Sequence, residues 1–206
     1  MFGSRGRSIT QQIDFYFDII SPASYLAAAR LPAVAAAAGA VIDWKPILLG
    51  GIFQGSGNAP PINAKAKSRY IAMDIARLAA HYGVPFANNP YFPFSTVTLQ
   101  RAAIALKQAH SAALVPFIQA AYRAVWAEQR DLKNPAEIAA VAASVGLDAA
   151  SLLAQANEPA TKDALRAATD EAVARGAFGA PTMFIGDDMF FGQDRVDLIG
   201  QMLAAT

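Results

Sequence analysis

The sequence predicts an α/β fold with an inserted all-helical domain, and the order of its elements carries this prediction. Strand, helix and strand patterns follow one another at the front of the chain, while a strand hairpin and a helix end it. The residues between these two parts have helical periodicity. Because a strand, a helix and a second strand in succession imply a right-handed crossover between parallel strands, we expect one sheet built from both ends of the chain.

The front of the chain supplies the predicted crossover. Residues 13–20, IDFYFDII, are aromatic and β-branched, which is typical of a central strand. Ser21 comes next, before a proline and an Ala- and Leu-rich stretch over 22–38, so we expect a helix there with Ser21 as its N-cap. Residues 41–49, VIDWKPILL, predict the second strand, and the Gly-rich segment 50–63 is expected to be a long loop.

The middle and the end of the chain complete the pattern. The middle predicts a block of helices, interrupted by the turn-rich segments YGVPFANNPYFPFS, QRDLKNP and GLDAAS. PTMFIG and DMFFG predict a hairpin over 182–191, and a last helix is expected from Asp194. We therefore divide the chain into a disordered extension (1–12), a sheet domain (13–63 with 177–206) and an inserted helical domain (64–176).

Charge and composition narrow the class of partner. Seventeen basic and sixteen acidic side chains leave a net charge of +1, so the sequence predicts a small-molecule ligand and no nucleic acid. Charged residues make up 16% of the chain against a usual ~25%, while apolar residues reach 54%. Some of that apolar surface is expected between subunits, so we expect a homodimer.

Other functions are disfavoured by what the chain lacks. Without cysteine it has no disulfide, no Cys-ligated zinc and no cysteine nucleophile. His81 and His110 are its only histidines, and neither has the spacing of a hydrolase triad or a metal site, so no metal is expected. The most apolar stretch is interrupted by Arg30, Pro32 and Gly39, which argues against a membrane span. The first twelve residues have no apolar core of secretory type, which favours a cytoplasmic location.

The element order is the thioredoxin-like arrangement with a helical insertion, and three motifs make a family resemblance specific. DFYFDIISPASYL, LLGGIFQGSGNAPP and GAFGAPTMFIGDDMFFGQDR resemble the 2-hydroxychromene-2-carboxylate isomerases and the related kappa-class glutathione transferases. They stand in the same order as in that family, and the resemblance covers nearly the whole chain. It implies a thioredoxin-like fold and glutathione as the cofactor.

The SPAS turn is the predicted catalytic element. Related disulfide oxidoreductases carry Cys-x-x-Cys there, whereas this chain places Ser21 and Ser24, which excludes thiol exchange by the protein itself. Lowering a thiol pKa of ~8.5 by two units needs roughly 2.7 kcal/mol. A hydrogen bond to a charged group contributes about 1.5–3 kcal/mol and a helix N-terminus about 0.3–1 kcal/mol, which is enough.

The resemblance assigns a role to each of these serines. It implies that the catalytic residue is Ser21, which would stabilise the thiolate of bound glutathione. From the turn alone, an ordinary N-cap is the alternative reading of Ser21. Ser24 is expected to be structural.

The GAPT motif is the second predicted contact. Pro181 precedes a strand that would otherwise be interior, an unfavourable place for a residue without an N–H, and a cis bond would reconcile the two. A trans proline at an edge strand is the alternative from the residues alone. The resemblance implies that the Ala180–Pro181 bond is cis and that the backbone of Ala180 pairs with the cysteinyl part of glutathione.

Polar residues of the other motifs are predicted to hold the two ends of the tripeptide. The resemblance implies that Gln193 and Asp194 bind the γ-glutamyl end, although helix capping by Asp194 is the alternative. It also implies that Asn58 contacts glutathione and that Lys67 pairs with the glycyl carboxylate. Without the family, Lys67 reads as a solvated surface lysine.

An acceptor pocket for a flat aromatic substrate is predicted from aromatic residues. Phe53, Tyr91 and Trp126 are expected to border it, while positions in the core are the alternative for each of them.

The resemblance implies a glutathione-dependent isomerase that interconverts 2-hydroxychromene-2-carboxylate and trans-o-hydroxybenzylidenepyruvate in aromatic-hydrocarbon degradation. A kappa-class transferase that conjugates glutathione to small electrophiles is the alternative within the family. A non-catalytic thiol-binding module is the alternative from another class.

Overall fold

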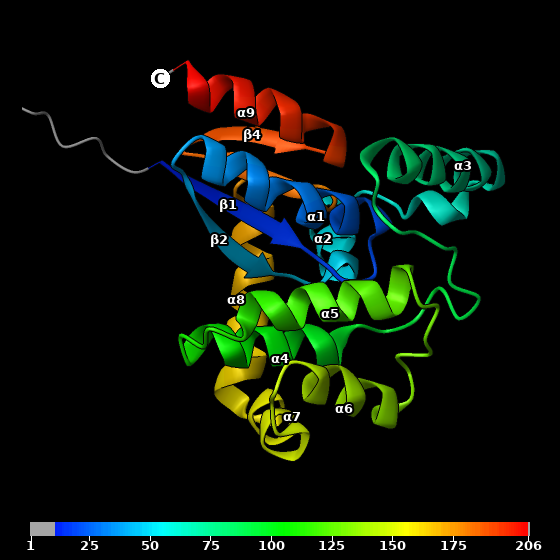
Figure 1. Cartoon of the computed structure of the whole chain (residues 1–206), viewed down its shortest axis with the longest axis vertical. Coiled ribbons are helices and arrows are strands. Elements are labelled where there is room, and N and C mark those ends of the chain that lie inside the picture. Colours follow the sequence, from blue (N-terminus) through cyan, green and yellow to red (C-terminus); the bar gives the residue numbers. More distant parts are fainter. Residues whose placement is uncertain (1–10, 206) are drawn as a thin grey trace, which may run out of the picture.

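Residues 11–205 are described by a computed structural model, and within them the strands form a four-stranded mixed sheet of order β2-β1-β3-β4 (Figure 1). β1 (Gln12–Phe17) pairs in parallel with β2 (Val41–Pro46) and antiparallel with β3 (Thr182–Ile185). β3 forms a hairpin with β4 (Asp188–Phe191). The predicted parallel crossover and the predicted C-terminal hairpin are both confirmed.

The long region between β2 and β3 is helical, as its periodicity predicts. In Figure 1, α4, α5, α6 and α7 lie together on one side of the sheet, while α3 projects from the body of the molecule. The helices of the described chain are α1 (Pro22–Ala37), α2 (Leu49–Ser56), α3 (Lys65–Tyr82), α4 (Val97–Gln108), α5 (Leu114–Trp126), α6 (Pro135–Ser144), α7 (Ala149–Asn157), α8 (Pro159–Ala174) and α9 (Val196–Ala204), with short 3₁₀ helices η1 (Pro61–Asn63) and η2 (Gln193–Arg195).

The predicted N-terminal extension falls almost wholly on residues 1–10, which lie outside the described residues. Gln12, however, already belongs to β1, so the first strand begins one residue earlier than predicted. Among the described residues no single helix is both long and apolar enough to span a membrane, and the pair α6 and α7 meets the length and composition criteria only with a bend of 116°.

The predicted loop over 50–63 is wrong for most of its length, because α2 and η1 occupy it. Gly51 and Gly55 lower the helix propensity of this segment. In the fold they allow α2 to approach α8 closely: a Cβ at Gly51 would lie 2.8 Å from Thr169, and one at Gly55 would lie 3.0 Å from Val173. Tertiary packing thus favours a helix that local propensity opposes.

Both strands of the crossover are shorter than predicted. β1 ends at Phe17 and β2 ends at Pro46, which has no N–H to continue the ladder. The carbonyl of Phe17 still accepts from the N–H of Ile47 at 3.0 Å, and the side chain of Gln100 on α4 donates to the carbonyls of Phe17 and Ile47, at 2.8 and 2.7 Å. The residues between Phe17 and Ser21 are therefore free to form the turn that leads into α1.

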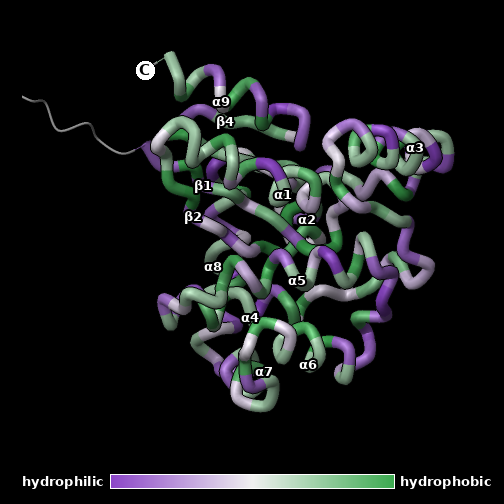
Figure 2. The backbone as a smooth tube through the Cα atoms, in the orientation of Figure 1, coloured by the Kyte–Doolittle hydropathy of each residue, from purple (hydrophilic) through white to green (hydrophobic). Residues whose placement is uncertain are grey.

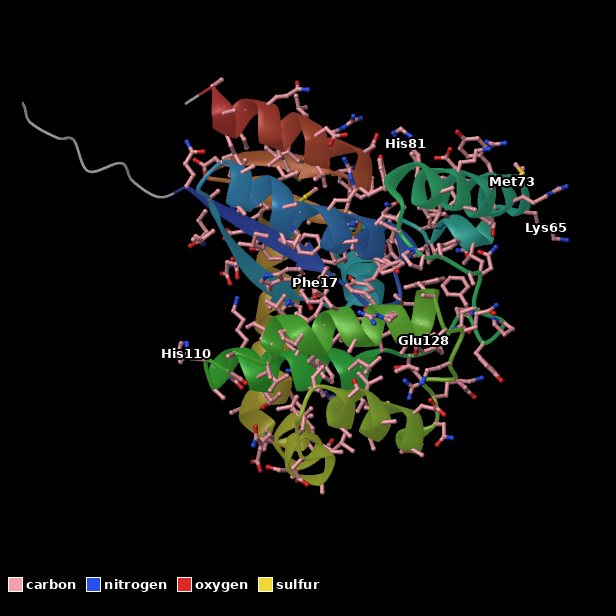
Figure 3. All side chains as sticks on the ribbon, in the orientation of Figure 1. Phe17, Lys65, Met73, His81, His110 and Glu128 are labelled. Atoms are coloured by element: carbon pink, nitrogen blue, oxygen red, sulfur yellow. The ribbon has the colours of Figure 1, made fainter. Side chains whose placement is uncertain are left out.

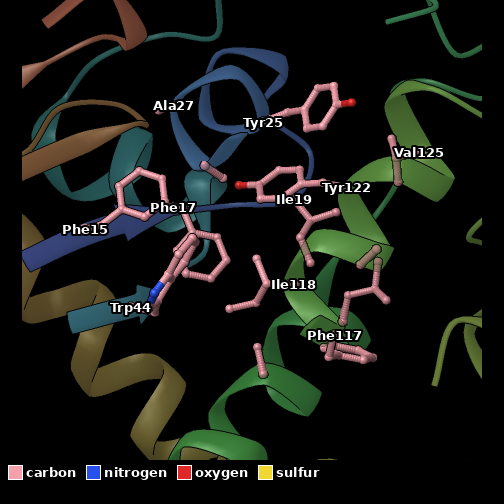
Figure 4. Close-up of a cluster of buried hydrophobic side chains, with 14 of the residues drawn as sticks. Phe15, Phe17, Ile19, Tyr25, Ala27, Trp44, Phe117, Ile118, Tyr122 and Val125 are labelled. Carbon is pink, nitrogen blue, oxygen red and sulfur yellow. The ribbon is translucent and has the colours of Figure 1, made fainter. Parts of the chain in front are cut away.

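A continuous hydrophobic core joins the sheet to the helical region. Phe15, Phe17 and Trp44 of the sheet pack with Ile118 and Tyr122 of α5 in one buried cluster (Figure 4). Hydrophilic residues are frequent instead along α3 (Figure 2). Because one core spans both parts, the inserted helices α4 and α5 are held rigidly against the end of β1.

The opposite face of the sheet carries a charged network that ties α8 to β1 and β2. Glu171 accepts hydrogen bonds from Tyr16 at 2.6 Å and from Lys45 at 2.9 Å. Arg175 donates to Asp14 at 2.6 Å and to Tyr16 at 3.1 Å. These contacts fix the last helix of the insertion on the sheet.

The same network sets the pKa of its carboxyl groups. Burial alone would raise the pKa of Asp14 and of Glu171, but their hydrogen bonds and the neighbouring cations outweigh it and hold both pKa values below the usual range. A carboxyl whose pKa is lower in the folded chain stabilises the fold above its unfolded pKa of about 4. That stabilisation is lost as the pH falls through the folded pKa.

We expect Arg175→Met to lower the free energy of unfolding by about 1–3 kcal/mol at pH 7, because it removes hydrogen bonds between charged, half-buried groups. The difference from the native protein should narrow below about pH 4, where the carboxylates become protonated. Urea denaturation across pH measures both effects. Arg166→Met is the control: this side chain is 75% exposed, so we expect a change within about 0.5 kcal/mol. Equal losses in the two variants would contradict the prediction.

Candidate functional site

Ser21 caps the N-terminus of α1, as predicted, and also contacts a distant segment. Its hydroxyl oxygen accepts from the backbone N–H of Ser24 at 3.1 Å. The same hydroxyl donates to the backbone carbonyl of Ala180 at 3.0 Å, across 159 positions of sequence. Ser21 is 5% exposed, so it lies just beneath the surface at a helix N-terminus, where the helix dipole favours negative charge.

The segment before β3 brings the second motif to Ser21. The Ala180–Pro181 peptide bond is cis, which confirms the resemblance on this point. Ala180 is half-buried and Pro181 is buried. The carbonyl of Pro181 accepts from the N–H of Gly192 at 3.0 Å, so this segment also contacts the residue that precedes η2. The fold therefore brings together the first and third motifs of the sequence.

Asn58 joins the second motif to the same segment. It lies after α2 and donates from Nδ2 to the carbonyl of Phe178 at 2.8 Å, while its Oδ1 accepts from the N–H of Ala59 at 2.8 Å. The side chain of Asn58 is exposed. An amide in this position can present its remaining hydrogen-bonding capacity to a ligand that lies over the segment.

The two charged residues predicted to bind glutathione are both exposed. Lys67 is in the first turn of α3 and has no ion pair with any residue of 11–205. Asp194 is in η2, with a carboxylate oxygen 3.4 Å from the Arg195 guanidinium. In the described chain neither η2 nor α9 has a side-chain cap, so the alternative reading of Asp194 as a helix cap is wrong.

The aromatic residues predicted to border an acceptor pocket differ in exposure. Phe53 is half-buried on α2, and Tyr91 is 42% exposed in the loop before α4. Trp126 is only 3% exposed, and its indole Nε1 donates to the carbonyl of Ile19 at 2.9 Å. The prediction for Trp126 therefore needs correction: it supports the turn before α1 from within the core, because its indole N–H has a backbone partner there.

The two histidines lie on the outer surface, far from each other (Figure 3). Within residues 11–205 no group of three or more His, Cys, Asp or Glu side chains is placed to hold a metal ion.

Asp18 is a residue of the site that the sequence patterns did not single out. It is 2% exposed, and its carboxylate accepts from the N–H of Ile20 at 3.1 Å, the N–H of Leu49 at 2.8 Å and the hydroxyl of Thr96 at 2.6 Å. Its backbone carbonyl accepts from the N–H of Ser21 at 3.0 Å. A carboxylate directly after an apolar strand, three residues before the predicted N-cap, is the signal that would have indicated it.

Burial and hydrogen bonding act in opposite directions on the pKa of Asp18. Desolvation raises the pKa of the Asp18 carboxyl, although its hydrogen bonds from Leu49, Thr96 and the adjacent backbone act in the opposite direction. Burial also raises the pKa of Tyr122 well above its usual value, and the nearby charge of Asp18 adds to this. Tyr122 is therefore a neutral phenol that donates to the Asp18 carbonyl at 3.2 Å.

The arrangement has the parts needed to stabilise an external anion. Ser21 supplies a hydroxyl at a helix N-terminus, and the Ala180 carbonyl beside it can accept a hydrogen bond from a peptide N–H. Lys67 and Asp194 are exposed charges of opposite sign, and their role at this site stays a prediction. The chain has no cysteine, so it cannot itself supply a reactive sulfur.

Comparison with known proteins identifies the family of this chain. Residues 12–204 match the family model of the DSBA-like thioredoxin domain. The chain is 37% identical over 197 residues to the 2-hydroxychromene-2-carboxylate isomerase of Sphingobium xenophagum, covering 95% of this chain and 99% of that protein. It is 28% identical over 211 residues to glutathione S-transferase kappa 1 of Homo sapiens, with 95% and 92% covered.

A solved structure gives the same result. The structure of a 2-hydroxychromene-2-carboxylate isomerase superposes with a TM-score of 0.82 at 29% identity, over 94% of this chain and 95% of that one. This confirms the thioredoxin-like fold with a helical insertion. The chain belongs to the DSBA-like thioredoxin family, together with the 2-hydroxychromene-2-carboxylate isomerases and the kappa-class glutathione transferases.

Proposed function

We propose that this protein is a glutathione-dependent isomerase that interconverts 2-hydroxychromene-2-carboxylate and trans-o-hydroxybenzylidenepyruvate in aromatic-hydrocarbon degradation. One observation carries the proposal: the Ser21 hydroxyl lies at the N-terminus of α1 and against the carbonyl of the cis Ala180–Pro181 segment. The relative with 37% identity over nearly the full length of both chains supports this activity.

The residues around Ser21 fit a cysteinyl peptide. A bound cysteinyl N–H can donate to the carbonyl of Ala180, which now accepts from the Ser21 hydroxyl. The hydroxyl is then free to turn and donate to the sulfur, while its oxygen still accepts from the N–H of Ser24. Because one hydrogen bond replaces another, Ser21 can stabilise a thiolate without leaving a buried group unpaired.

The exposed residues fit the charged ends of the same peptide. Lys67 can pair with the glycyl carboxylate, and Asp194 can pair with the γ-glutamyl ammonium. The amide of Asn58 and the backbone N–H of Gln193 can donate to the remaining carboxylate and carbonyl oxygens.

The chain would contribute to the chemistry by lowering the pKa of a bound thiol and orienting it. When bound, glutathione would supply a nucleophilic sulfur for reversible addition to the conjugated double bond; with the ring C–O bond opened to the phenol and ketone, the resulting single bond can rotate, and loss of the sulfur would leave the trans alkene. Ser21 and the N-terminus of α1 stabilise the deprotonated form of that sulfur. Phe53 and Tyr91 can stack on the flat substrate from the outer side.

A kappa-class transferase is the second candidate, supported by the human relative at 28% identity. It would use the same activated sulfur but leave it attached to an electrophile. Parallel assays on the chromene substrate and on chlorodinitrobenzene distinguish the two. Stoichiometric loss of glutathione during turnover of the chromene substrate would exclude the isomerase.

We also propose a cytoplasmic homodimer. Glutathione keeps thiols reduced in the cytosol, so the cofactor that this activity needs would be available there. α3 exposes Tyr70 and Met73, which are 55% and 50% accessible, and Figure 3 shows Met73 on the outside of this helix. Such side chains on a projecting helix fit an interface with a second copy.

We expect Ser21→Ala to raise the pKa of the glutathione thiol in the complex by about one to two units, because the sulfur loses a hydrogen bond to its charged form. Turnover of the chromene substrate should fall at least about tenfold at pH 7. The ultraviolet absorbance of the thiolate of bound glutathione, followed against pH, measures the change in the thiol pKa. Loss of the cap should cost about 1 kcal/mol of stability.

Ser24→Ala is the matched control for this variant. Ser24 lies in the same helical turn and is fully buried, and the substitution keeps the backbone N–H that Ser21 accepts from. We expect the thiol pKa to stay within about 0.3 units. Unchanged turnover in Ser21→Ala, or an equal loss in both variants, would refute the assigned role of Ser21.

We expect Lys67→Met to raise the KM for glutathione roughly tenfold with little change in kcat, because the lysine binds a part of the peptide that does not react. Lys65→Met is the control, since Lys65 is exposed on the same turn of α3 and has no predicted contact (Figure 3). Steady-state kinetics with glutathione as the varied component test both. The same KM in the two variants would remove Lys67 from the site.

A further inference from the structure

We propose that Asp18 and Thr96 form a positioning pair through which the inserted helices hold the turn that carries Ser21. The inference rests on the proposed function, because the turn is the part of the fold that would meet the glutathione sulfur. Neither Asp18 nor Thr96 is itself a predicted ligand contact, so their effect would be transmitted through Ser21, whose N–H donates to the Asp18 carbonyl.

The contacts of the Asp18 carboxylate connect three separate segments. Its Oδ1 accepts from the N–H of Ile20 within the turn, and from the hydroxyl of Thr96 at the start of α4. Its Oδ2 accepts from the N–H of Leu49, the first residue of α2. One side chain therefore fixes the turn relative to both α2 and the inserted helix α4.

The backbone of the same turn is held by the insertion as well. The carbonyl of Phe17 accepts from Gln100 at 2.8 Å, that of Asp18 from Tyr122 at 3.2 Å, and that of Ile19 from Trp126 at 2.9 Å. These donors come from α4 and α5, and each is less than 4% exposed. Figure 4 shows Tyr122 reaching from α5 toward the end of β1. Consecutive carbonyls thus face donors that cannot move without disturbing the core.

Within the described chain, the Asp18 carboxylate is held by neutral hydrogen-bond donors alone. Asp18 is buried, and no lysine, arginine or histidine of residues 11–205 forms an ion pair with it. A buried charge without an opposite charge opposes folding, and here its hydrogen bonds from neutral donors offset that cost. What the carboxylate provides is geometry, since its two oxygens accept from three directions at once and so restrict the path of the chain into Ser21.

The position of the Ser21 hydroxyl depends directly on this path. The N–H of Ser21 donates to the carbonyl of Asp18, and its hydroxyl donates to the Ala180 carbonyl at 3.0 Å. A displacement of a reacting or stabilising group by about 1 Å can cost up to roughly a hundredfold in rate. Loosening the pair should therefore reduce turnover while the glutathione contacts on α3 and η2 remain.

The experiment compares variants of two buried threonines in the inserted helices. Thr96→Val removes the hydroxyl that donates to Asp18, and Thr96→Ser restores it. Thr161→Val is the matched control, because Thr161 is 3% exposed against 4% for Thr96 and also loses one side-chain hydrogen bond, to Gln108. Asp18→Asn is the stronger variant, since one oxygen that accepts now becomes an amide that donates.

Two measurements are made on each variant. Hydrogen exchange of the Ile20, Ser21 and Leu49 amides, without glutathione, reports whether the turn is held. Steady-state kinetics and the thiol pKa of bound glutathione report whether Ser21 is placed correctly.

We expect faster exchange at these amides in Thr96→Val and Asp18→Asn but not in Thr161→Val. The kcat should fall about threefold to tenfold in Thr96→Val and more in Asp18→Asn, with KM for glutathione within about threefold and with Thr96→Ser near the native protein. In a Ser21→Ala background Asp18→Asn should change the thiol pKa no further, because it acts through Ser21.

Unchanged exchange in Thr96→Val and Asp18→Asn would overturn the inference, whatever the kinetics. Faster exchange with unchanged kcat would overturn it too, since the pair would then be structural only. If the native protein binds no glutathione, the proposed function fails, and the catalytic part of this inference fails with it. In that case the hydrogen-exchange measurement still tests the structural part, namely that Asp18 and Thr96 hold the turn.

Discussion

The N-terminus of α1 is the constraint on which this structure depends. Its free N–H groups and partial positive charge need an acceptor, and Ser21 supplies one from its side chain while donating to Ala180, which precedes the neighbouring strand β3. Everything else at the site follows from keeping that hydroxyl in place. The cis segment before β3 supplies the carbonyl that receives it, and the β1 end supplies the turn that presents it.

The inserted helices contribute to this constraint although they lie outside the sheet. α4 and α5 place Gln100, Tyr122 and Trp126 against the carbonyls of the turn, and Thr96 against the carboxylate of Asp18. Because these side chains belong to the same core as β1, the insertion and the turn form one rigid unit. The helical region therefore has a physical role at the site besides covering it.

The polar groups of the site divide into an inner and an outer set. The inner groups are buried, satisfied by hydrogen bonds and suited to fixing a geometry. The outer groups, Asn58, Lys67 and Asp194, are exposed, and we propose that they bind the ligand. Sulfur is absent from both sets, since the chain has no cysteine, which agrees with a site that acts on a thiol brought by another molecule.

The sequence by itself determined the α/β class, the parallel crossover, the C-terminal hairpin, the N-cap at Ser21 and, through resemblance, the cis bond at Pro181. These features depend on short stretches of sequence: the composition of the strands, a capping residue before a proline, and a complete motif that matches a known family. Only the tertiary structure decided that the Gly-rich segment after β2 is a helix, because close packing of Gly51 on α8 outweighs its propensity. Only the tertiary structure placed Trp126 in the core and gave Asp18 its partners, because donors that lie far apart in the sequence meet there through folding alone.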